Sequence, residues 1–341
     1  MIYPKINKKN IEISVIAPSS NCGDSVYSKI RNDSAISKFN KLGHKIDFTK
    51  NAYGTAYKFA SANELERAVE FMEAYKSNSD LILALRGGEL QMEILPYIDF
   101  KDILNYKPKW YQGFSDNTVL TYTLTTICDI ATIYGTNFGD FGMKPWHKYI
   151  KQNYNFWFGK NEILKSTSKH EPAFLEKKEG HECDGYKCKI KTKYQIITGE
   201  KEVKIKGRLI GGCLDILREL CGSKYDNTSN FLEKYKNDGF LWYLESCDLK
   251  DWDTIRCLWK LKDNGWFKYV KGFLIGRPAL ENDFKDINAI DCYLHILKDF
   301  NVPIIYNMDF GHVKPNFYIV NGAIGELNVK NGKGEIKYFL Q

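Results

Sequence analysis

One serine in this chain stands where a nucleophile could work. Ser115 lies in the run KWYQGFSDNTVL at residues 109–120, where β-favouring residues enter a Gly-x-Ser turn and an apolar segment with helical spacing follows. A strand, a sharp turn and a helix together form a nucleophile elbow, which lifts a serine Oγ clear of a sheet. Ser115 is therefore the candidate nucleophile. Asn117 stands where the elbow usually has glycine, and a Gly-x-Ser sequence taken alone is more often only a turn.

An acid and a base that could serve this serine lie in the second half of the chain. Glu245 ends the apolar run at residues 239–244, and a carboxylate there needs a partner or a crevice because an unpaired buried charge is costly. Of the six histidines, His312 alone follows a predicted buried strand into a glycine turn. His312 would take the Ser115 proton and Glu245 would orient the imidazole, since triads are defined by geometry and not by chain order. A chain of this length contains many such combinations, so the pattern by itself is weak evidence.

Loops at the ends of predicted strands add groups suited to binding. The apolar run at residues 81–85 predicts a strand buried on both faces. It leads into Gly87 and Gly88, where the missing Cβ lets backbone N–H groups approach a ligand, although an ordinary turn also uses such glycines. We expect the N–H groups of Gly88 and Asp116 to hold an oxyanion. The other predicted substrate contacts at these loops are Ser19, Arg86 and Gly87.

The elements that must position these residues alternate between strand and helix through the first part of the chain. Short apolar runs predict strands and 3.6-residue spacing predicts helices. This alternation indicates the α/β class, with a flavodoxin-like, doubly wound domain at residues 1–165 that carries the elbow. The predicted strands are 11–16, 45–48, 81–85, 110–111 and 130–135, and the predicted helices are 25–42, 63–75, 94–104, 119–127 and 143–158.

The composition changes after this domain. Residues 166–206 are polar and rich in lysine and glutamate, which predicts a linker or flap hairpin. Residues 207–341 predict a second α/β domain, strand-rich and of the swivelling kind, that carries Glu245 and His312. Its predicted strands are 206–212, 239–245, 271–276 and 302–306, and its predicted helices are 214–220, 253–266 and 288–300.

Overall composition excludes several classes of protein. The chain has 341 residues, of which 43% are hydrophobic and 27% charged, so it is long enough for two folded domains. The net charge of +7 comes from 49 basic and 42 acidic residues scattered along the chain, which does not indicate a nucleic-acid partner. No signal peptide or long apolar run is visible, so we expect a cytoplasmic protein without a membrane partner. Nine cysteines lack metal-ligand spacing, and even the close pair Cys183 and Cys188 predicts no metal and no cofactor.

The ordered motifs of the chain resemble the L,D-carboxypeptidase family of serine peptidases. These motifs are Ala17–Ser20, Arg86–Gly88, Gly113–Asp116, Gly211–Leu214, Glu245 and Gly311–His312. The resemblance implies an α/β N-terminal domain with the nucleophile, a C-terminal domain with Glu and His, and an active site between them. It also implies metal-independent cleavage of an amide bond next to a carboxylate. The resemblance alone adds to the predicted substrate contacts Asn137, Tyr186, Tyr194 and Cys213. Arg86 is the nearest basic residue for such a carboxylate, although it could equally brace the glycine loop.

Within that family the sequence resembles the branch of microcin C self-immunity proteins, termed MccF-like, more than it resembles the murein tetrapeptide carboxypeptidases. The similarity lies in residues 134–142 and 258–267 and in the aromatic insert that begins at Trp146. The branch implies detoxification of peptidyl- or aminoacyl-nucleotides, with the insert closing over a nucleobase. Relatives commonly have asparagine where this chain has Cys213. The insert contains Tyr186 and Tyr194 where immunity proteins have tryptophan. Because of these differences, the alternative function is that of an L,D-carboxypeptidase that acts on murein tetrapeptides in cell-wall recycling. We expect a homodimer.

Two other classes remain to be weighed. A nucleotide- or sugar-phosphate-binding protein without catalysis would also place glycines at strand ends. A metal-dependent hydrolase would need a ligand motif such as His-x-x-x-His, which the sequence lacks.

Overall fold

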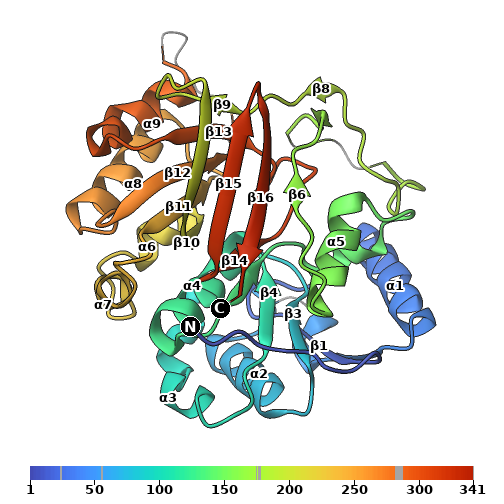
Figure 1. Ribbon diagram of the computed structural model, residues 1–341. Helices are drawn as coiled ribbons and strands as arrows, with labels where there is room; N and C mark the ends of the chain where they lie inside the picture. Colours follow the sequence, from blue (N-terminus) through green and yellow to red (C-terminus); the bar gives the residue numbers. More distant parts are fainter. Residues whose placement is uncertain (24, 55–56, 174, 176–177, 281–286, 341) are drawn as a thin grey trace. The chain divides into compact units, whose positions relative to one another are not determined.

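A computed structural model of the chain describes residues 1–23, 25–54, 57–173, 175, 178–280 and 287–340. It divides into two compact units, drawn in Figure 1. The N-terminal unit is Ile2–Lys160 with Glu176–Gly185, and the C-terminal unit is Asn161–Leu175 and Tyr186–Gln341 with Met1. Among the described residues, no helix has the length and apolar character that crossing a bilayer requires.

The N-terminal unit is built on parallel strands in the order β5-β4-β3-β1-β2. Each neighbouring pair in this order is parallel, and the order is that of flavodoxin-like sheets. The predicted fold class is thus confirmed. The strands are β1 (Glu12–Ile16), β2 (Lys45–Phe48), β3 (Leu81–Ala84), β4 (Trp110–Gly113) and β5 (Thr132–Tyr134).

The helices of this unit begin where the sequence offers capping groups. Asn63 caps α2, because its side chain accepts a hydrogen bond of 2.9 Å from the Glu66 N–H. Ser25 caps α1 in the same way through the Ser28 N–H. The helices are α1 (Val26–Lys41), α2 (Glu64–Lys76), α3 (Phe100–Ile103), α4 (Thr118–Cys128) and α5 (Lys148–Trp157).

Helix α4, which follows Ser115, is buried along almost its whole length although it carries several threonines. Two of their hydroxyls are satisfied inside the helix: Thr123 Oγ1 donates to the Val119 carbonyl at 2.6 Å, and Thr126 Oγ1 donates to the Tyr122 carbonyl at 2.9 Å. Such bonds to the carbonyl four residues earlier remove the cost of burying a hydroxyl. The helix therefore provides a rigid support behind the turn that precedes it.

The C-terminal unit contains, among the described residues, an eight-stranded mixed sheet in the order β6-β16-β15-β10-β11-β12-β13-β9. Strands β10 to β13 are parallel to one another, whereas β15 and β16 form a long antiparallel hairpin (Figure 1). The main strands are β10 (Glu202–Cys213), β11 (Phe240–Glu245), β12 (Val270–Gly276), β13 (Ile304–Met308), β15 (Ile324–Lys330) and β16 (Lys333–Phe339). The shorter strands are β6 (Leu164–Lys165), β7 (Lys169–His170), β8 (Ile190–Lys191), β9 (Gln195–Ile196) and β14 (Ile319–Asn321).

Helices follow the parallel strands of this unit and pack beside them. In Figure 1, α8 and α9 lie next to one another beside β11 and β12. A capping box at Asn288 starts α9, because the side chains of Asn288 and Asp291 each accept a hydrogen bond from the other's backbone N–H. The helices are α6 (Leu214–Leu220), α7 (Thr228–Lys234), α8 (Asp251–Asp263) and α9 (Ala289–Leu297).

Candidate active site

Ser115 occupies a strained turn between β4 and α4. Its φ is +66°, a left-handed conformation that a serine seldom adopts. A Cβ on Gly113, at the end of β4, would lie 2.7 Å from the Asn117 Cβ and 2.9 Å from the Ala84 Cβ, so this turn is closed too tightly for any other residue. Strand, strained serine and helix are the parts of a nucleophile elbow.

Asn117 explains the departure from the usual elbow sequence. It is fully buried, and its side-chain nitrogen donates to the carbonyls of Phe114 at 3.2 Å and Arg86 at 3.1 Å. Its oxygen accepts a hydrogen bond of 2.6 Å from the Tyr111 hydroxyl. The amide thus ties the serine turn to the neighbouring Gly87–Gly88 loop, which glycine at this position could not do.

The Gly87–Gly88 loop lies directly against Ser115. A Cβ added to Gly87 would be 3.2 Å from Ser115 Oγ and 3.6 Å from the Asp116 backbone nitrogen. A Cβ on Gly88 would be only 2.3 Å from Ser19 Oγ, in the loop after β1. The ends of β1, β3 and β4 therefore meet at one place, where open α/β sheets bind ligands.

Asp116 links the same three loops through its side chain. Its Oδ2 accepts hydrogen bonds from the Ser19 hydroxyl and, at 2.9 Å, from the Gln91 N–H. Only 1% of Asp116 is exposed. Burial raises its pKa to about 6, although these two hydrogen bonds act in the opposite direction.

Two further predicted binding residues have structural partners in this unit. Asn137 Oδ1 accepts a hydrogen bond of 3.2 Å from the Phe114 N–H and so braces the elbow. Arg86 is exposed, and its guanidinium donates to the Asn21 carbonyl at 3.2 Å. The exposed guanidinium is compatible with both predicted roles of Arg86.

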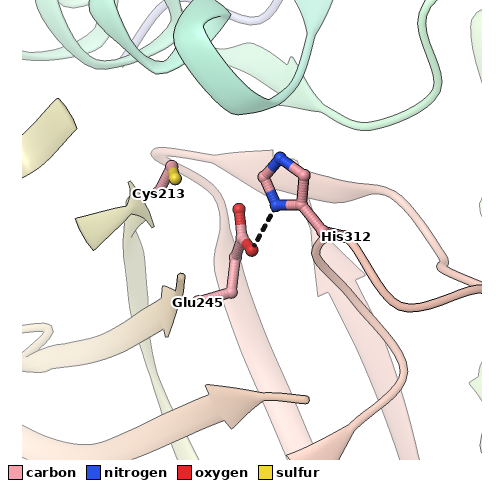
Figure 2. Close-up of side chains that lie close together, drawn as sticks. All are labelled: Cys213, Glu245 and His312. Atoms are coloured by element: carbon pink, nitrogen blue, oxygen red, sulfur yellow. Dashed lines mark hydrogen bonds and ion pairs between the residues drawn. The ribbon is translucent and has the colours of Figure 1, made fainter. Parts of the chain in front are cut away.

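Glu245 and His312 form a hydrogen-bonded pair in the C-terminal unit. Figure 2 shows the two side chains pointing toward each other, and His312 Nδ1 lies 2.8 Å from Glu245 Oε2. Because an ionised carboxylate only accepts, the proton belongs on Nδ1 and leaves Nε2 as the basic nitrogen. Gly311 permits the contact: its φ is +97°, and a Cβ there would be 2.7 Å from Glu245 Oε2.

The surroundings of His312 favour its charged form. Burial lowers the pKa of the imidazole, but the Glu245 carboxylate beside it and the Cys247 thiol act in the other direction and raise the pKa well above its usual value. Glu245 itself is completely buried at the end of β11. A carboxylate in this position fixes the histidine ring and stabilises an imidazolium, as the acid of a triad does.

Cys213, predicted to contact substrate, lies beside Glu245 in the same unit. The parallel register of β10 and β11 pairs the two residues, and Figure 2 shows the Cys213 thiol next to the carboxylate. The thiol is buried and lies 3.2 Å from Asp215 Oδ2. Burial, followed by the charges of Glu245 and Asp215, raises the pKa of Cys213.

The aromatic residues of the insert are largely engaged in packing within their own units. Trp146 donates its indole N–H to the Phe141 carbonyl at 2.6 Å. Tyr194 is 3% exposed, and its hydroxyl donates to Asp309 Oδ2 at 2.9 Å. These contacts favour a structural role for Tyr194, whereas Tyr186 is half-buried. The predicted flap hairpin is represented by the two-residue strands β8 and β9, which pair with β7 and β13.

Sequence reasoning missed an ion pair that supports the His312 loop. Arg277, which directly follows β12, is buried and lies 2.6 Å from Asp309 Oδ1. It also donates to the carbonyls of Val313 at 3.1 Å and Pro315 at 2.8 Å, in the segment directly after the histidine. The sequence feature that could have identified Arg277 is a charged residue directly after an apolar run, the same feature that identified Glu245.

Comparisons with known proteins agree with this architecture. The LD-carboxypeptidase N-terminal domain matches residues 13–135, and the LD-carboxypeptidase C-terminal domain matches residues 206–327. A Treponema pallidum protein that carries the provisional name carboxypeptidase is 26% identical over 93% of this chain and 90% of its own. The Microcin C7 self-immunity protein MccF of Escherichia coli is 24% identical over 87% of this chain and 85% of its own.

Solved structures show the same fold over the full length. An MccF-like protein from Bacillus anthracis str. Ames superposes with a TM-score of 0.78 at 25% identity, covering 100% of both chains. MccF in complex with glutamyl sulfamoyl guanosine superposes with a TM-score of 0.79 at 20% identity, covering 98% of both chains. The chain therefore belongs to the LD-carboxypeptidase family and is a hydrolase of the peptidase class.

Proposed function

We propose that this protein is a serine amidase in which Ser115 is the nucleophile, His312 the general base and Glu245 the residue that orients His312. The observation that carries the proposal is the Ser115 turn, where the serine has a φ of +66° and Gly87 lies so close that a Cβ added to it would be 3.2 Å from Ser115 Oγ. The left-handed backbone of Ser115 and the close approach of Gly87 are features of catalytic sites, where strain positions the nucleophile and backbone N–H groups bind an oxyanion.

The chemistry proceeds in two halves. Ser115 Oγ attacks the amide carbonyl while His312 Nε2 takes its proton, and the N–H groups of Gly88 and Asp116 hold the oxyanion. His312 then passes that proton to the leaving nitrogen, which departs and leaves an acyl-enzyme on Ser115. Water, deprotonated by His312, releases the acid and restores the serine. Glu245 stabilises the imidazolium in both halves through the Nδ1 hydrogen bond.

The proposed bond is an amide adjacent to a carboxylate. Arg86 is the cation that would hold the carboxylate, since its guanidinium is exposed at the Gly87–Gly88 loop. Similarity to MccF favours an aminoacyl- or peptidyl-nucleotide as the substrate, because MccF has been crystallised with glutamyl sulfamoyl guanosine.

A second substrate class is favoured by a different observation. Tyr194, one of the two tyrosines expected to stack on a base, is buried with its hydroxyl on Asp309. A site with less aromatic surface suits a peptide better than a nucleobase, because base–aromatic stacking contributes roughly 1–3 kcal/mol per base. We therefore keep a murein tetrapeptide that ends in a D-residue as the alternative substrate.

Parallel assays separate these possibilities. Purified protein and its Ser115→Ala variant are incubated with an L,D-tetrapeptide and with an acidic aminoacyl sulfamoyl adenosine, and products are followed by mass spectrometry. Serine-dependent cleavage of the nucleotide substrate supports the MccF-like activity. Cleavage of the tetrapeptide alone supports a carboxypeptidase that acts on murein peptides. If neither substrate is cleaved and no covalent adduct forms with a fluorophosphonate, the proposed role of Ser115 as nucleophile is wrong.

A further inference from the structure

Three side chains of different chemistry converge at the ends of the parallel strands in the C-terminal unit. Cys213 ends β10, Glu245 ends β11, and His312 lies in the loop after β13. One ligand atom of each, a sulfur, a carboxylate oxygen and a ring nitrogen, all lie within 4.8 Å of one another. Figure 2 shows Cys213 and His312 on either side of the Glu245 carboxylate.

Glycines make this convergence possible. Gly211 has a φ of +151°, and a Cβ there would be 1.8 Å from the Tyr243 carbonyl oxygen. This brings the end of β10 against β11, with Cys213 opposite Glu245 in the register. Gly311 brings the histidine loop equally close from the other direction, because a Cβ there would overlap Glu245 Oε2.

The set of donors is one that Zn²⁺ prefers. Thiolate sulfur, imidazole nitrogen and carboxylate oxygen bind zinc at about 2.0–2.3 Å, which places tetrahedral ligand atoms about 3.3–3.8 Å apart. His312 Nδ1 and Glu245 Oε2, which are 2.8 Å apart, must therefore separate by about 0.5 Å, and the Cys213 sulfur, within 4.8 Å of the other ligand atoms, must approach by up to about 1 Å. Small side-chain rotations are enough for both changes. The charge also fits, because Glu245 is buried and a second carboxylate, Asp215, lies 3.2 Å from the Cys213 sulfur.

We propose that Cys213, Glu245 and His312 form an inhibitory site for a thiophilic divalent cation such as Zn²⁺. The cation replaces two protons, the thiol proton of Cys213 and the Nδ1 proton of the charged His312, and both pass to solvent; the ring keeps its Nε2 proton, and the metal takes the place of the Nδ1–H···Glu245 hydrogen bond. The side chain of His312 is 15% exposed, so water can reach the fourth position. Three protein ligands and an open position are typical of zinc sites that exchange ligands.

The consequence for activity rests on the proposed function. A metal held by Glu245 and His312 removes the base and its orienting acid from catalysis together, so Zn²⁺ acts as an inhibitor and never as a cofactor. Chelation restores the hydrogen-bonded pair. The binding itself does not depend on that role and can be measured without any substrate.

Cobalt is the probe for binding, because Co²⁺ reports a thiolate ligand through a charge-transfer absorption band. Reduced, chelator-treated full-length protein is titrated with CoCl₂, and we expect saturation at one equivalent together with that band. Cys213→Ser should lose the band, and His312→Ala should lose the one-equivalent saturation. Cys257→Ser is the matched control, because Cys257 is an equally buried cysteine whose thiol faces the Leu214 carbonyl; it should behave as wild type.

The inference is overturned if cobalt binds without a thiolate band, or if the band persists in Cys213→Ser and is lost with Cys183 or Cys188 instead. Should Cys213→Ser fail to fold, as judged by its thermal transition, the His312→Ala titration decides. Reversible Zn²⁺ inhibition of amide hydrolysis, relieved by EDTA, is the expected functional result. An enzyme that hydrolyses amides but neither binds cobalt nor responds to Zn²⁺ would remove this inference and leave the proposed function standing.

Discussion

His312 and Glu245 determine how activity should depend on pH. The Glu245 carboxylate raises the pKa of His312, and the histidine must be neutral to accept the Ser115 proton. We expect kcat/KM to increase with pH through the His312 pKa, because this profile reports the free enzyme's base. Glu245→Gln removes the negative charge, so the imidazole pKa falls and the ascending limb moves to lower pH.

The same substitution should lower the plateau by roughly 10²–10⁴-fold, because the amide no longer fixes the ring as the carboxylate does. The measurement is kcat/KM for wild type and variant from pH 5 to a pH above the wild-type His312 pKa of about 10, so that both plateaus are reached. An ascending limb that stays at the same pH in Glu245→Gln would show that His312 is not the group being titrated.

Asp116 should make the stability of the N-terminal unit depend on pH. Burial raises its pKa to about 6 from 3.8, so between these values the folded state binds more protons than the unfolded chain. Stability therefore falls as pH rises from about 4 to 6, and the loss is complete above that range. The free energy of unfolding should fall by about 2–3 kcal/mol across this range, since each unit of pKa shift corresponds to about 1.4 kcal/mol.

Asp116→Asn keeps the acceptor for Ser19 and Gln91 but does not titrate. We expect its Tm relative to wild type to increase between pH 4 and pH 7, measured by scanning calorimetry on both proteins. A Tm difference that is constant with pH would place the Asp116 pKa outside this window.

Arg86 should act on substrate affinity and not on the chemical step. Arg86→Gln removes the proposed partner of the substrate carboxylate, so KM for a peptide with a free carboxylate should rise about tenfold or more with kcat little changed. The same peptide with its terminus amidated should be a poor substrate for wild type and be unaffected by the change. A fall in kcat with unchanged KM would indicate that Arg86 braces the glycine loop.

At the scale of elements, the approach of the His312 loop to β11 depends on Gly311. Gly311→Ala should lower kcat by about 10²-fold or more, because a Cβ there meets Glu245 Oε2 and a displacement of 1 Å in a catalytic group costs about that much. Gly199→Ala is the matched control: its φ of +100° resembles the +97° of Gly311, but nothing lies within 4 Å of its Cβ position.

Both alanines have a similar backbone cost of about 1 kcal/mol, and Gly311→Ala adds the overlap with Glu245, so its Tm should fall further than that of Gly199→Ala. Only Gly311→Ala should lose activity, as measured by kcat and Tm on the same preparations. Equal kcat in the two variants would show that the loop position is not critical.

The sequence predicted the elements around the site well, because their signals are local. Helix α6 was predicted at 214–220 and is observed at Leu214–Leu220, and β11 was predicted at 239–245 and is observed at Phe240–Glu245. The predicted helix 94–104 is instead a 3₁₀ turn, Gln91–Tyr97, and a separate short helix α3. Pro96 interrupts the first, and the Asp99 side chain caps the second by accepting from the Lys101 and Asp102 N–H groups at 3.0 Å.

Long-range partners could not be predicted in the same way. Spacing along the chain shows that Asn117 is polar, but not that it donates to the Arg86 carbonyl 31 residues away. It likewise gives no reason to bury Tyr194 against Asp309, 115 residues away. Such contacts depend on strand order and register, which local periodicity does not determine.

At the scale of the whole molecule, the proposed catalytic residues are divided between the two units. Ser115 and its glycine loop belong to the N-terminal unit, and the Glu245–His312 pair belongs to the C-terminal unit. Each part is organised by contacts within its own unit: the serine by Asn117 and Asp116, the histidine by Glu245. The account therefore requires that a histidine of one unit activates a serine of the other.

Covalent labelling tests this requirement most directly. Wild type, Ser115→Ala and His312→Ala are treated with a fluorophosphonate, and adducts are located by intact mass and peptide mapping. We predict one adduct per wild-type chain, located on Ser115, absent in Ser115→Ala and formed about 10³-fold or more slowly in His312→Ala. An unlabelled wild type, an adduct on another residue, or equal labelling rates in wild type and His312→Ala would contradict the account.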